Sequence, residues 1–123
     1  MDTRKKGNVG EDLAVRFLNE NGYEVIARNY RLRDSEIDIV FKDNINVGYG
    51  IEEYIVFAEV KYRETHFSGY GYDAVTGSKM KQIIKAAKHF LYTNRYSDDT
   101  PVRFDVISIE KEEIRHIINA FEC

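Results

Sequence analysis

The stretch that decides the fold is YIVFAEVKYR, residues 54–63. It is a β-rich run in which two charged residues, Glu59 and Lys61, interrupt apolar ones. Side chains along a strand alternate between two faces, so residues two apart project from the same face. An acid and a base in an apolar run cost free energy unless they pair or bind an ion. The stretch therefore predicts a core strand that carries a polar site.

An alternating segment, residues 36–42, comes before this run and predicts a strand that pairs with it. Its residues are expected to divide between two faces, Ile37, Ile39 and Phe41 on one and Glu36, Asp38 and Val40 on the other. A hairpin can bring Asp38 opposite Glu59. The residues between the two strands, 43–53, carry Asn, Gly and acidic residues and are predicted to form a loop.

Further elements are predicted on both sides of this hairpin. Apolar residues at helical spacing predict a helix over residues 7–21, ended by Gly22, and another from Thr76 or Ser78 to Leu91. Strands are predicted over residues 23–33, 102–109 and 114–121. The order α-β-β-β-α-β, extended by a last strand, predicts an α/β fold with a mixed central β-sheet flanked by helices.

Length and composition limit the class of protein. With 123 residues, 43% apolar and 32% charged, the chain is predicted to be one domain over residues 1–123. The apolar runs are far shorter than the roughly 20 residues of a membrane span, so no membrane association is expected. The single cysteine, Cys123, excludes an intrachain disulfide and a Cys-based zinc site. These features favour a cytoplasmic protein.

Asp38, Glu59 and Lys61 are candidates for phosphodiester chemistry. Two carboxylates that meet at one place repel each other, and a hard cation such as Mg²⁺, which prefers oxygen ligands, relieves that repulsion. Such a cation activates water and binds phosphate, and Lys61 would add positive charge beside a scissile phosphate. Glu11 borders the apolar face of the first helix, where about 100° separates successive residues, and can point toward the sheet.

Structural explanations stay open for the same residues. Glu59 and Lys61 could form an ion pair at a sheet edge, and Asp38 could lie on a solvated strand face or support a turn. An acid in the first turn of a helix, such as Glu11, is favoured by the helix dipole whatever its function. Arg103 and Asp105 share a strand face and are predicted to pair with each other.

Four segments resemble the YraN-type family of proposed endonucleases: GNVGEDLA at 7–14, EIDIV at 36–40, FAEVKYR at 57–63 and RFDV at 103–106. That family is similar to archaeal Holliday-junction resolvases of the PD-(D/E)XK nuclease superfamily. The resemblance implies a restriction-endonuclease-like core with Asp38, Glu59 and Lys61 as catalytic residues. It further implies that Asp38 and Glu59 bind Mg²⁺ or Mn²⁺, with Glu11 as an additional acid near the metal. It also suggests DNA, including branched DNA, as substrate, and a homodimer.

A rim of residues around this site could bind nucleic acid. Basic side chains at Arg31, Arg63 and Lys79 could contact phosphates, and Tyr70, in a Gly- and Tyr-rich loop over residues 66–73, could stack on a base. The formal net charge of −3 argues against binding by charge alone, but a bound cation would offset the acids of the site. Two alternatives to a nuclease remain: a non-catalytic nucleic-acid-binding module with the same fold, and a structural or interaction domain whose charges form an ion-pair network.

Overall fold

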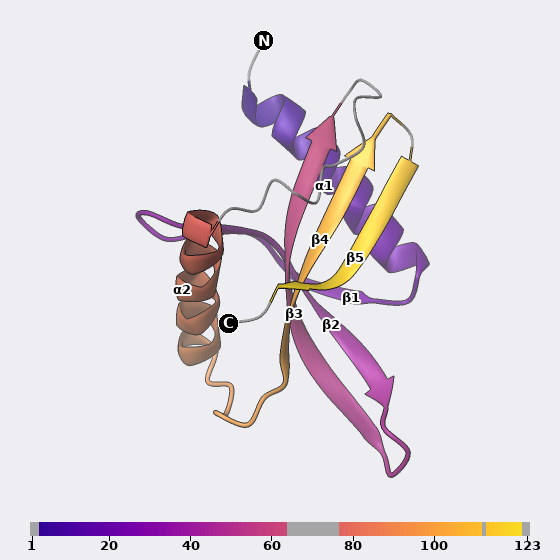
Figure 1. The fold of residues 1–123 in the computed structure, drawn as a ribbon, viewed down its shortest axis with the longest axis vertical. Coiled ribbons are helices and arrows are strands. Elements are labelled where there is room, and N and C mark those ends of the chain that lie inside the picture. Colours follow the sequence, from indigo (N-terminus) through magenta and orange to yellow (C-terminus); the bar gives the residue numbers. More distant parts are fainter. Residues whose placement is uncertain (1–2, 64–76, 112, 122–123) are drawn as a thin grey trace.

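The computed structural model describes residues 3–63, 77–111 and 113–121 (Figure 1). Its elements are α1 (Thr3–Glu20), β1 (Glu24–Arg31), β2 (Glu36–Asn46), β3 (Ile51–Arg63), α2 (Gly77–Thr93), β4 (Val102–Glu110) and β5 (Glu113–Phe121). The predicted order is confirmed, including the last strand. Gly22 follows α1 with φ of 85°, a left-handed conformation that glycine adopts without strain, as expected for the residue that ends a helix.

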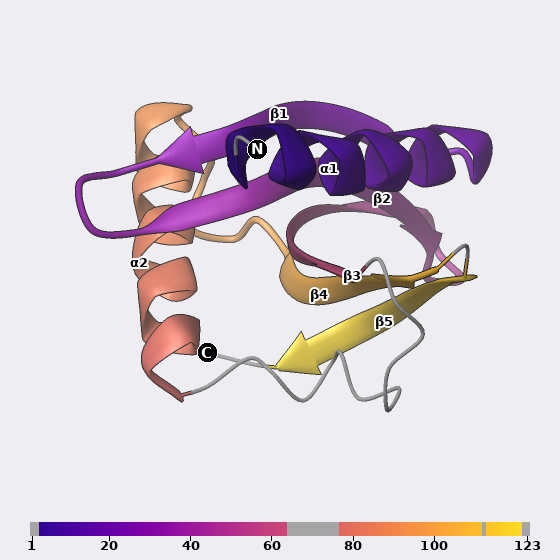
Figure 2. The same ribbon diagram turned by 90° about the horizontal axis from the view of Figure 1, so that it is seen from above.

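The five strands form one mixed sheet in the order β1-β2-β3-β4-β5. Neighbouring strands are antiparallel except β3 and β4, which are parallel and are connected through α2. Helix α1 packs against β1, β2, β3 and β4, and α2 packs on the other face of the sheet, as the two views show (Figure 1 and Figure 2). No helix in the described ranges is both long and apolar enough to cross a membrane. The strand order, the mixed pairing and the two helices confirm the predicted α/β fold with a mixed central sheet.

The hydrophobic core is divided between two faces of the sheet, and β3 contributes to both. Ile55 and Phe57 pack in a cluster with Ile83 and Phe90 of α2. Val56 and Ala58 alternate with them and pack in a cluster with residues of α1, including Leu18. A central strand buried on both faces is expected to read as a nearly continuous apolar run, which explains why residues 55–58 lack polar side chains. Charged residues that follow in such a strand need partners.

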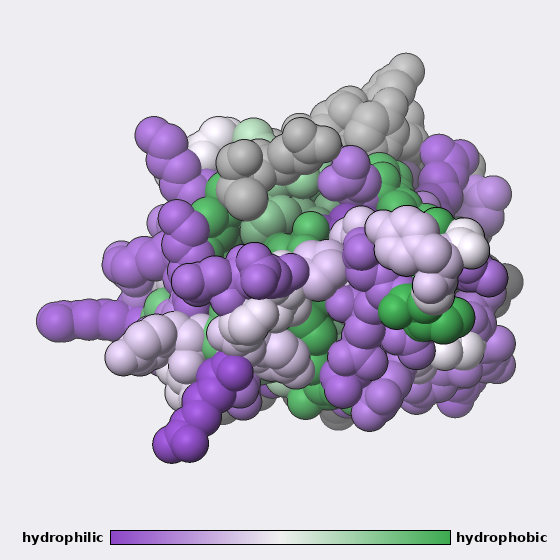
Figure 3. Space-filling model, turned by 90° about the horizontal axis from the view of Figure 1, so that it is seen from below, coloured by the Kyte–Doolittle hydropathy of each residue, from purple (hydrophilic) through white to green (hydrophobic). Residues whose placement is uncertain are grey.

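The loop predicted over residues 43–53 is wrong. The two strands stay paired from Asp43↔Tyr54 to Asn46↔Ile51, and only residues 47–50 connect them. Ladder hydrogen bonds join backbone groups, so the Asn and acidic side chains that suggested a loop do not prevent pairing. The paired end projects from the body of the molecule in Figure 1, and the side chains of Tyr49 and Ile51 are 90% and 69% exposed. From below, apolar surface is visible among polar side chains (Figure 3).

The regular alternation predicted for β2 is also wrong. Ile37 joins the cluster that contains α2, whereas Ile39 joins the cluster that contains α1. Residues two apart in a regular strand share a face, so β2 must turn over near Asp38. The adjacent strand has a matching irregularity: Asn29, between the pairs Arg28↔Ile39 and Tyr30↔Ile37, has φ of 51°. A left-handed residue interrupts the alternation of side chains in β1. Because β2 stays paired with β1 before and after Asn29, the alternation of side chains in β2 is interrupted at the same place.

Candidate active site

Asp38 lies where β2 and β3 separate. The last backbone pair before this point is Ile39↔Ala58. Beyond it, the side chain of Asp38 continues the connection, because its Oδ2 accepts a hydrogen bond of 2.8 Å from the amide N–H of Val60. This bond holds the carboxylate against the part of β3 that carries Glu59 and Lys61. The predicted meeting of Asp38 with this segment is therefore present in the structure.

Glu59 is a buried carboxylate held by two cations. Only 7% of the residue is exposed. Lys61 Nζ lies 3.7 Å from Glu59 Oε1, which places the two on the same face of β3 as predicted. Lys79 Nζ, from the first turn of α2, lies at the same distance from the same oxygen. The site thus contains residues from β2, β3 and α2.

The electrostatics of this site oppose ionisation of its acids. Burial raises the pKa of Asp38 to about 8, and the negative charge of Glu59 adds to the rise, while the hydrogen bond from Val60 opposes it. The pKa of Glu59 is also raised by burial, against the effect of the ammonium groups of Lys79 and Lys61. Two partly buried carboxyl groups therefore share a place where a further positive charge would be stabilising. Such raised pKa values are typical of functional sites.

Glu11 is brought to the edge of this site by the close approach of α1 to β3. A Cβ added to Gly10 would lie 2.7 Å from Tyr62 Cβ, so only glycine allows this distance between helix and strand. Glu11 itself is buried, and its Oε1 accepts hydrogen bonds from Asn29 Nδ2 at 2.9 Å and Arg28 Nη2 at 3.4 Å. Burial raises its pKa, which Arg28 counteracts. The charge of Glu11 in turn raises the pKa of Asp38.

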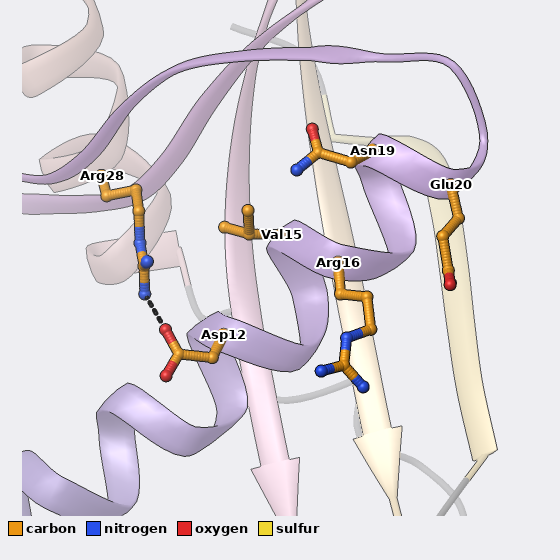
Figure 4. Close-up of a pocket in the computed structure, with 6 residues that line it drawn as sticks. All are labelled: Asp12, Val15, Arg16, Asn19, Glu20 and Arg28. Atoms are coloured by element: carbon orange, nitrogen blue, oxygen red, sulfur yellow. Dashed lines mark hydrogen bonds and ion pairs between the residues drawn. The ribbon is translucent and has the colours of Figure 1, made fainter.

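Arg28 connects Glu11 to the outer surface of α1. Its Nη2 also contacts Asp12 Oδ1 at 2.6 Å (Figure 4). Arg28 and Asp12 line an open cleft of about 460 Å³ along α1 with four further residues, Val15, Arg16, Asn19 and Glu20. Arg28 is therefore shared between the buried Glu11 and the exposed Asp12.

Sequence reasoning did not include Glu36 among the site residues. Its charge raises the pKa values of Asp38, Glu59 and Glu11, so it lies within electrostatic range of all three. It forms an ion pair with Arg31, whose Nε lies 2.9 Å from Glu36 Oε2. The signal in the sequence was its place two residues before Asp38 in the segment EIDIV.

The donor set fits a hard divalent cation held by two carboxylates. Within residues 3–63, 77–111 and 113–121, no group of three or more His, Cys, Asp and Glu side chains is arranged to hold a metal ion. A three-acid arrangement of Glu11, Asp38 and Glu59 is thus not assembled, and a role for Glu11 as a ligand stays a prediction. Mg²⁺ commonly binds through only one or two carboxylates, and waters and substrate phosphate complete its coordination. Asp38 and Glu59 can provide the two carboxylates.

The residues of the predicted nucleic-acid rim differ in their positions. Lys79 contacts Glu59 directly, and the side chain of Arg31 is 59% exposed beside Glu36. Arg63, the last residue of β3, is half-buried, two residues beyond Lys61. Tyr70 and the loop over residues 66–73 lie outside the described residues. Three of the four predicted contacts are therefore near the site, and binding by each stays a prediction.

The predicted pair of Arg103 and Asp105 is confirmed and belongs to a separate buried network. Arg103 Nε and Nη2 donate to Asp105 Oδ1 and Oδ2, both at 2.9 Å, and Arg103 Nη1 donates to Asp43 Oδ2 at 2.7 Å. His116 Nε2 lies 2.7 Å from Asp105 Oδ2, and Asn119 N donates to Oδ1 at 2.9 Å. Burial raises the pKa of Asp105, but these hydrogen bonds outweigh it and leave the pKa below its usual value.

Comparison with known proteins identifies the family. The model of the uncharacterised protein family UPF0102 matches residues 10–109, a range that contains Glu11, Asp38, Glu59, Lys61 and Lys79. The chain belongs to UPF0102. A UPF0102 protein of Lachnoclostridium phytofermentans is 43% identical over 123 residues, which are all of this chain and 98% of the relative.

Other UPF0102 relatives match over a similar length. A protein of Clostridioides difficile is 38% identical, over 98% of this chain and all of the relative, and one of Legionella pneumophila is 37% identical, over 98% of both. The resemblance to the YraN-type family is confirmed by these matches. The similarity to UPF0102 proteins thus extends over nearly the whole chain and does not depend on the E-x-K motif alone.

Proposed function

We propose that this UPF0102 protein is a Mg²⁺- or Mn²⁺-dependent endonuclease that hydrolyses DNA phosphodiester bonds. The observation that carries the proposal is the placement of Asp38 beside the segment of β3 that bears Glu59 and Lys61, at the point where β2 and β3 separate. Burial raises the pKa values of both carboxyl groups, and the charge of Glu59 adds to the rise for Asp38. A divalent cation would stabilise the ionised form of both.

Each residue has a separate part in the proposed reaction. Asp38 and Glu59 would hold the cation, which supplies a water of lowered pKa and polarises the phosphate. Lys61 lies 3.7 Å from Glu59 Oε1, so its ammonium group is beside the same place and can stabilise negative charge that develops on the phosphate. Glu11 is fixed by Arg28 and Asn29 and would add negative charge near the cation.

The proposal extends to the surroundings of the site. Exposed or half-buried basic groups at Arg31, Arg63 and Lys79 border the acids and would contact the DNA backbone. We include branched DNA among the substrates, a homodimer as the active form and the cytoplasm as the location, each following from the family resemblance or from the composition.

A second candidate function also has support. Lys61 and Lys79 neutralise Glu59 with no metal ion, which is what a structural ion-pair network would do. A non-catalytic module that binds nucleic acid through the same basic groups is the third candidate. The three candidate functions predict different effects of removing a single charge on DNA cleavage, on DNA binding and on protein stability.

The deciding experiment compares cleavage of linear, single-stranded, flapped and four-way-junction DNA with Mg²⁺ or Mn²⁺. We expect Lys61→Ala to lose on the order of 10²-fold in cleavage because it removes charge needed in the transition state, while Mn²⁺ still raises its melting temperature. Asp38→Ala and Glu59→Ala should lose both cleavage and the Mn²⁺ effect. Lys85→Ala is the matched control, since this lysine of α2 pairs with Asp34 on the surface.

Other outcomes would favour the alternatives. If the wild type binds branched DNA but cuts none, and all variants bind equally well, the protein is a binding module. If it neither binds nor cuts, and Lys61→Ala mainly lowers stability, the ion-pair network is the better description, because the buried Glu59 loses one of its two cationic partners. Cleavage that survives in all three site variants would indicate a contaminating nuclease.

A further inference from the structure

Two lysines from different elements approach one oxygen of Glu59. Lys61 of β3 and Lys79 of α2 each place Nζ 3.7 Å from Glu59 Oε1. A single carboxylate with one negative charge therefore faces two ammonium groups. If one of these groups moves away, the other still faces Glu59.

The position of Lys79 in α2 favours an anion beside its ammonium group. The helix begins at Gly77 and has no acidic residue in its first turn. The first turn of a helix carries unpaired N–H groups and the positive end of the helix dipole, so a lysine there is unfavourable unless an anion faces it. Glu59 supplies that anion in this structure.

The two lysines differ in their freedom to leave Glu59. Lys61 is two residues from Glu59 on the same strand, and its side chain is 23% exposed. Lys79 comes from the opposing helix, and its side chain is 36% exposed. A flexible four-carbon chain that already reaches water can turn its ammonium group toward a ligand that enters from solvent. Lys79 is therefore the better placed of the two to exchange Glu59 for another anion.

We propose that Lys79 is a phosphate-binding residue that neutralises Glu59 until a divalent cation and DNA occupy the site. A cation held by Asp38 and Glu59 would place two positive charges near the ammonium group of Lys79, and the repulsion would favour a contact of Lys79 with a non-bridging oxygen of the phosphodiester. Lys79 thus opposes metal binding in the free protein and supports the phosphate in the complex. This inference rests on the proposed nuclease function.

The test uses three variants of the intact chain. Lys79→Met removes the charge, Lys79→Arg keeps it, and Lys81→Met removes the same charge from an exposed position in the same helix. Mn²⁺ is titrated by calorimetry into metal-free protein without DNA. We expect Lys79→Met to bind Mn²⁺ about 3- to 10-fold more tightly, corresponding to the effect of removing one partly exposed like charge. The other two variants should stay within about twofold of wild type.

Cleavage of a labelled four-way junction at saturating Mn²⁺ tests the second part. Lys79→Met should raise KM for DNA by about tenfold because one phosphate contact is lost, whereas Lys79→Arg should largely restore it. Lys79→Gln replaces Lys79→Met if the latter shows a lower melting temperature than Lys81→Met.

The outcomes separate this inference from the proposed function. Wild type that binds Mn²⁺ and cuts DNA, together with Lys79→Met of unchanged Mn²⁺ affinity, would overturn the role of Lys79 and leave the nuclease proposal intact. A tighter Mn²⁺ affinity with an unchanged KM would overturn the phosphate contact. Wild type that binds no Mn²⁺ would overturn both proposals.

Discussion

Two buried clusters of charge lie on the same sheet, and they are compensated very differently. In the Arg103–Asp105 network, the fully buried Asp105 accepts hydrogen bonds from Arg103 and from the backbone of Asn119 and contacts His116, and its pKa is lowered. At the candidate active site, Asp38 accepts one hydrogen bond from Val60, and its pKa is raised to about 8. The first cluster is complete without a ligand, whereas the second would gain from another cation.

This difference distinguishes charge that stabilises the fold from charge that is kept for chemistry. A buried ion network that is fully hydrogen-bonded is costly to interrupt, because the remaining partners stay buried without compensation. Acids held close together without enough positive charge make the fold less stable than it could be, and such strain is common at functional sites. The RFDV segment therefore serves the fold, although it resembles the family as clearly as the E-x-K segment does.

The largest expected effect comes from neutralising one aspartate in each cluster. Asp105→Asn should lower the free energy of unfolding by about 3–5 kcal/mol, since Arg103 and His116 lose their charged partner in the interior. Asp38→Asn should change it by less than about 1 kcal/mol or raise it, because the amide oxygen can still accept from Val60 and the repulsion with Glu59 is gone. Urea unfolding at constant m-value measures both.

Equal losses in these two variants would contradict the comparison. Asp34→Asn, at an exposed residue of the β1–β2 connection, controls for the substitution itself. A large loss of unfolding free energy in Asp38→Asn alone would show that the site stabilises the fold, and it would favour the ion-pair network over the nuclease.

The pH dependence of stability should differ in sign between the clusters. The folded-state pKa of Asp38, about 8, lies well above the usual value of an aspartate, so the native state binds the extra proton and stability falls as pH rises from about 4 to about 8. We expect a fall of about 2–3 kcal/mol, which is less than the full 1.36 kcal/mol for each pKa unit of the rise, because Asp38 is only half-buried and water screens its charge. Asp38→Asn should remove most of this slope.

Asp105 should act in the opposite direction and at lower pH. Its pKa is below the usual value, so the stability it contributes is present above about pH 4 and is lost as pH falls through the folded-state pKa. Chemical denaturation from pH 3 to pH 9 follows both windows. A wild-type stability that rises steadily between pH 5 and pH 8 would contradict the assignment of the raised pKa to the site.

The sequence predicted the composition of the site better than its geometry. Glu59 and Lys61 could be assigned to one face because strand periodicity is local, and their partnership with Asp38 followed from a hairpin. The place where the side chains of β2 exchange faces could not be predicted, because it depends on the left-handed conformation of Asn29, which asparagine tolerates but does not require. Lys79 was expected to touch DNA, but its contact with Glu59 depends on how α2 packs on the sheet.

The smallest expected effect concerns two glycines, Gly10 within α1 and Gly22 just after its end. Gly22→Ala places a side chain in open space at φ of 85°, so it should cost about 1–2 kcal/mol through backbone strain and leave the site unchanged. Gly10→Ala should cost a similar amount, because overpacking against Tyr62 by about 1–3 kcal/mol is partly offset by the better helix propensity of alanine.

Only Gly10→Ala displaces α1 from β3, and with it Glu11. We therefore expect Gly10→Ala alone to weaken cleavage and the Mn²⁺-induced rise in melting temperature, in assays on variants matched for stability. If both variants keep wild-type cleavage, the close approach of α1 stabilises the fold only, and Glu11 has no part in the reaction.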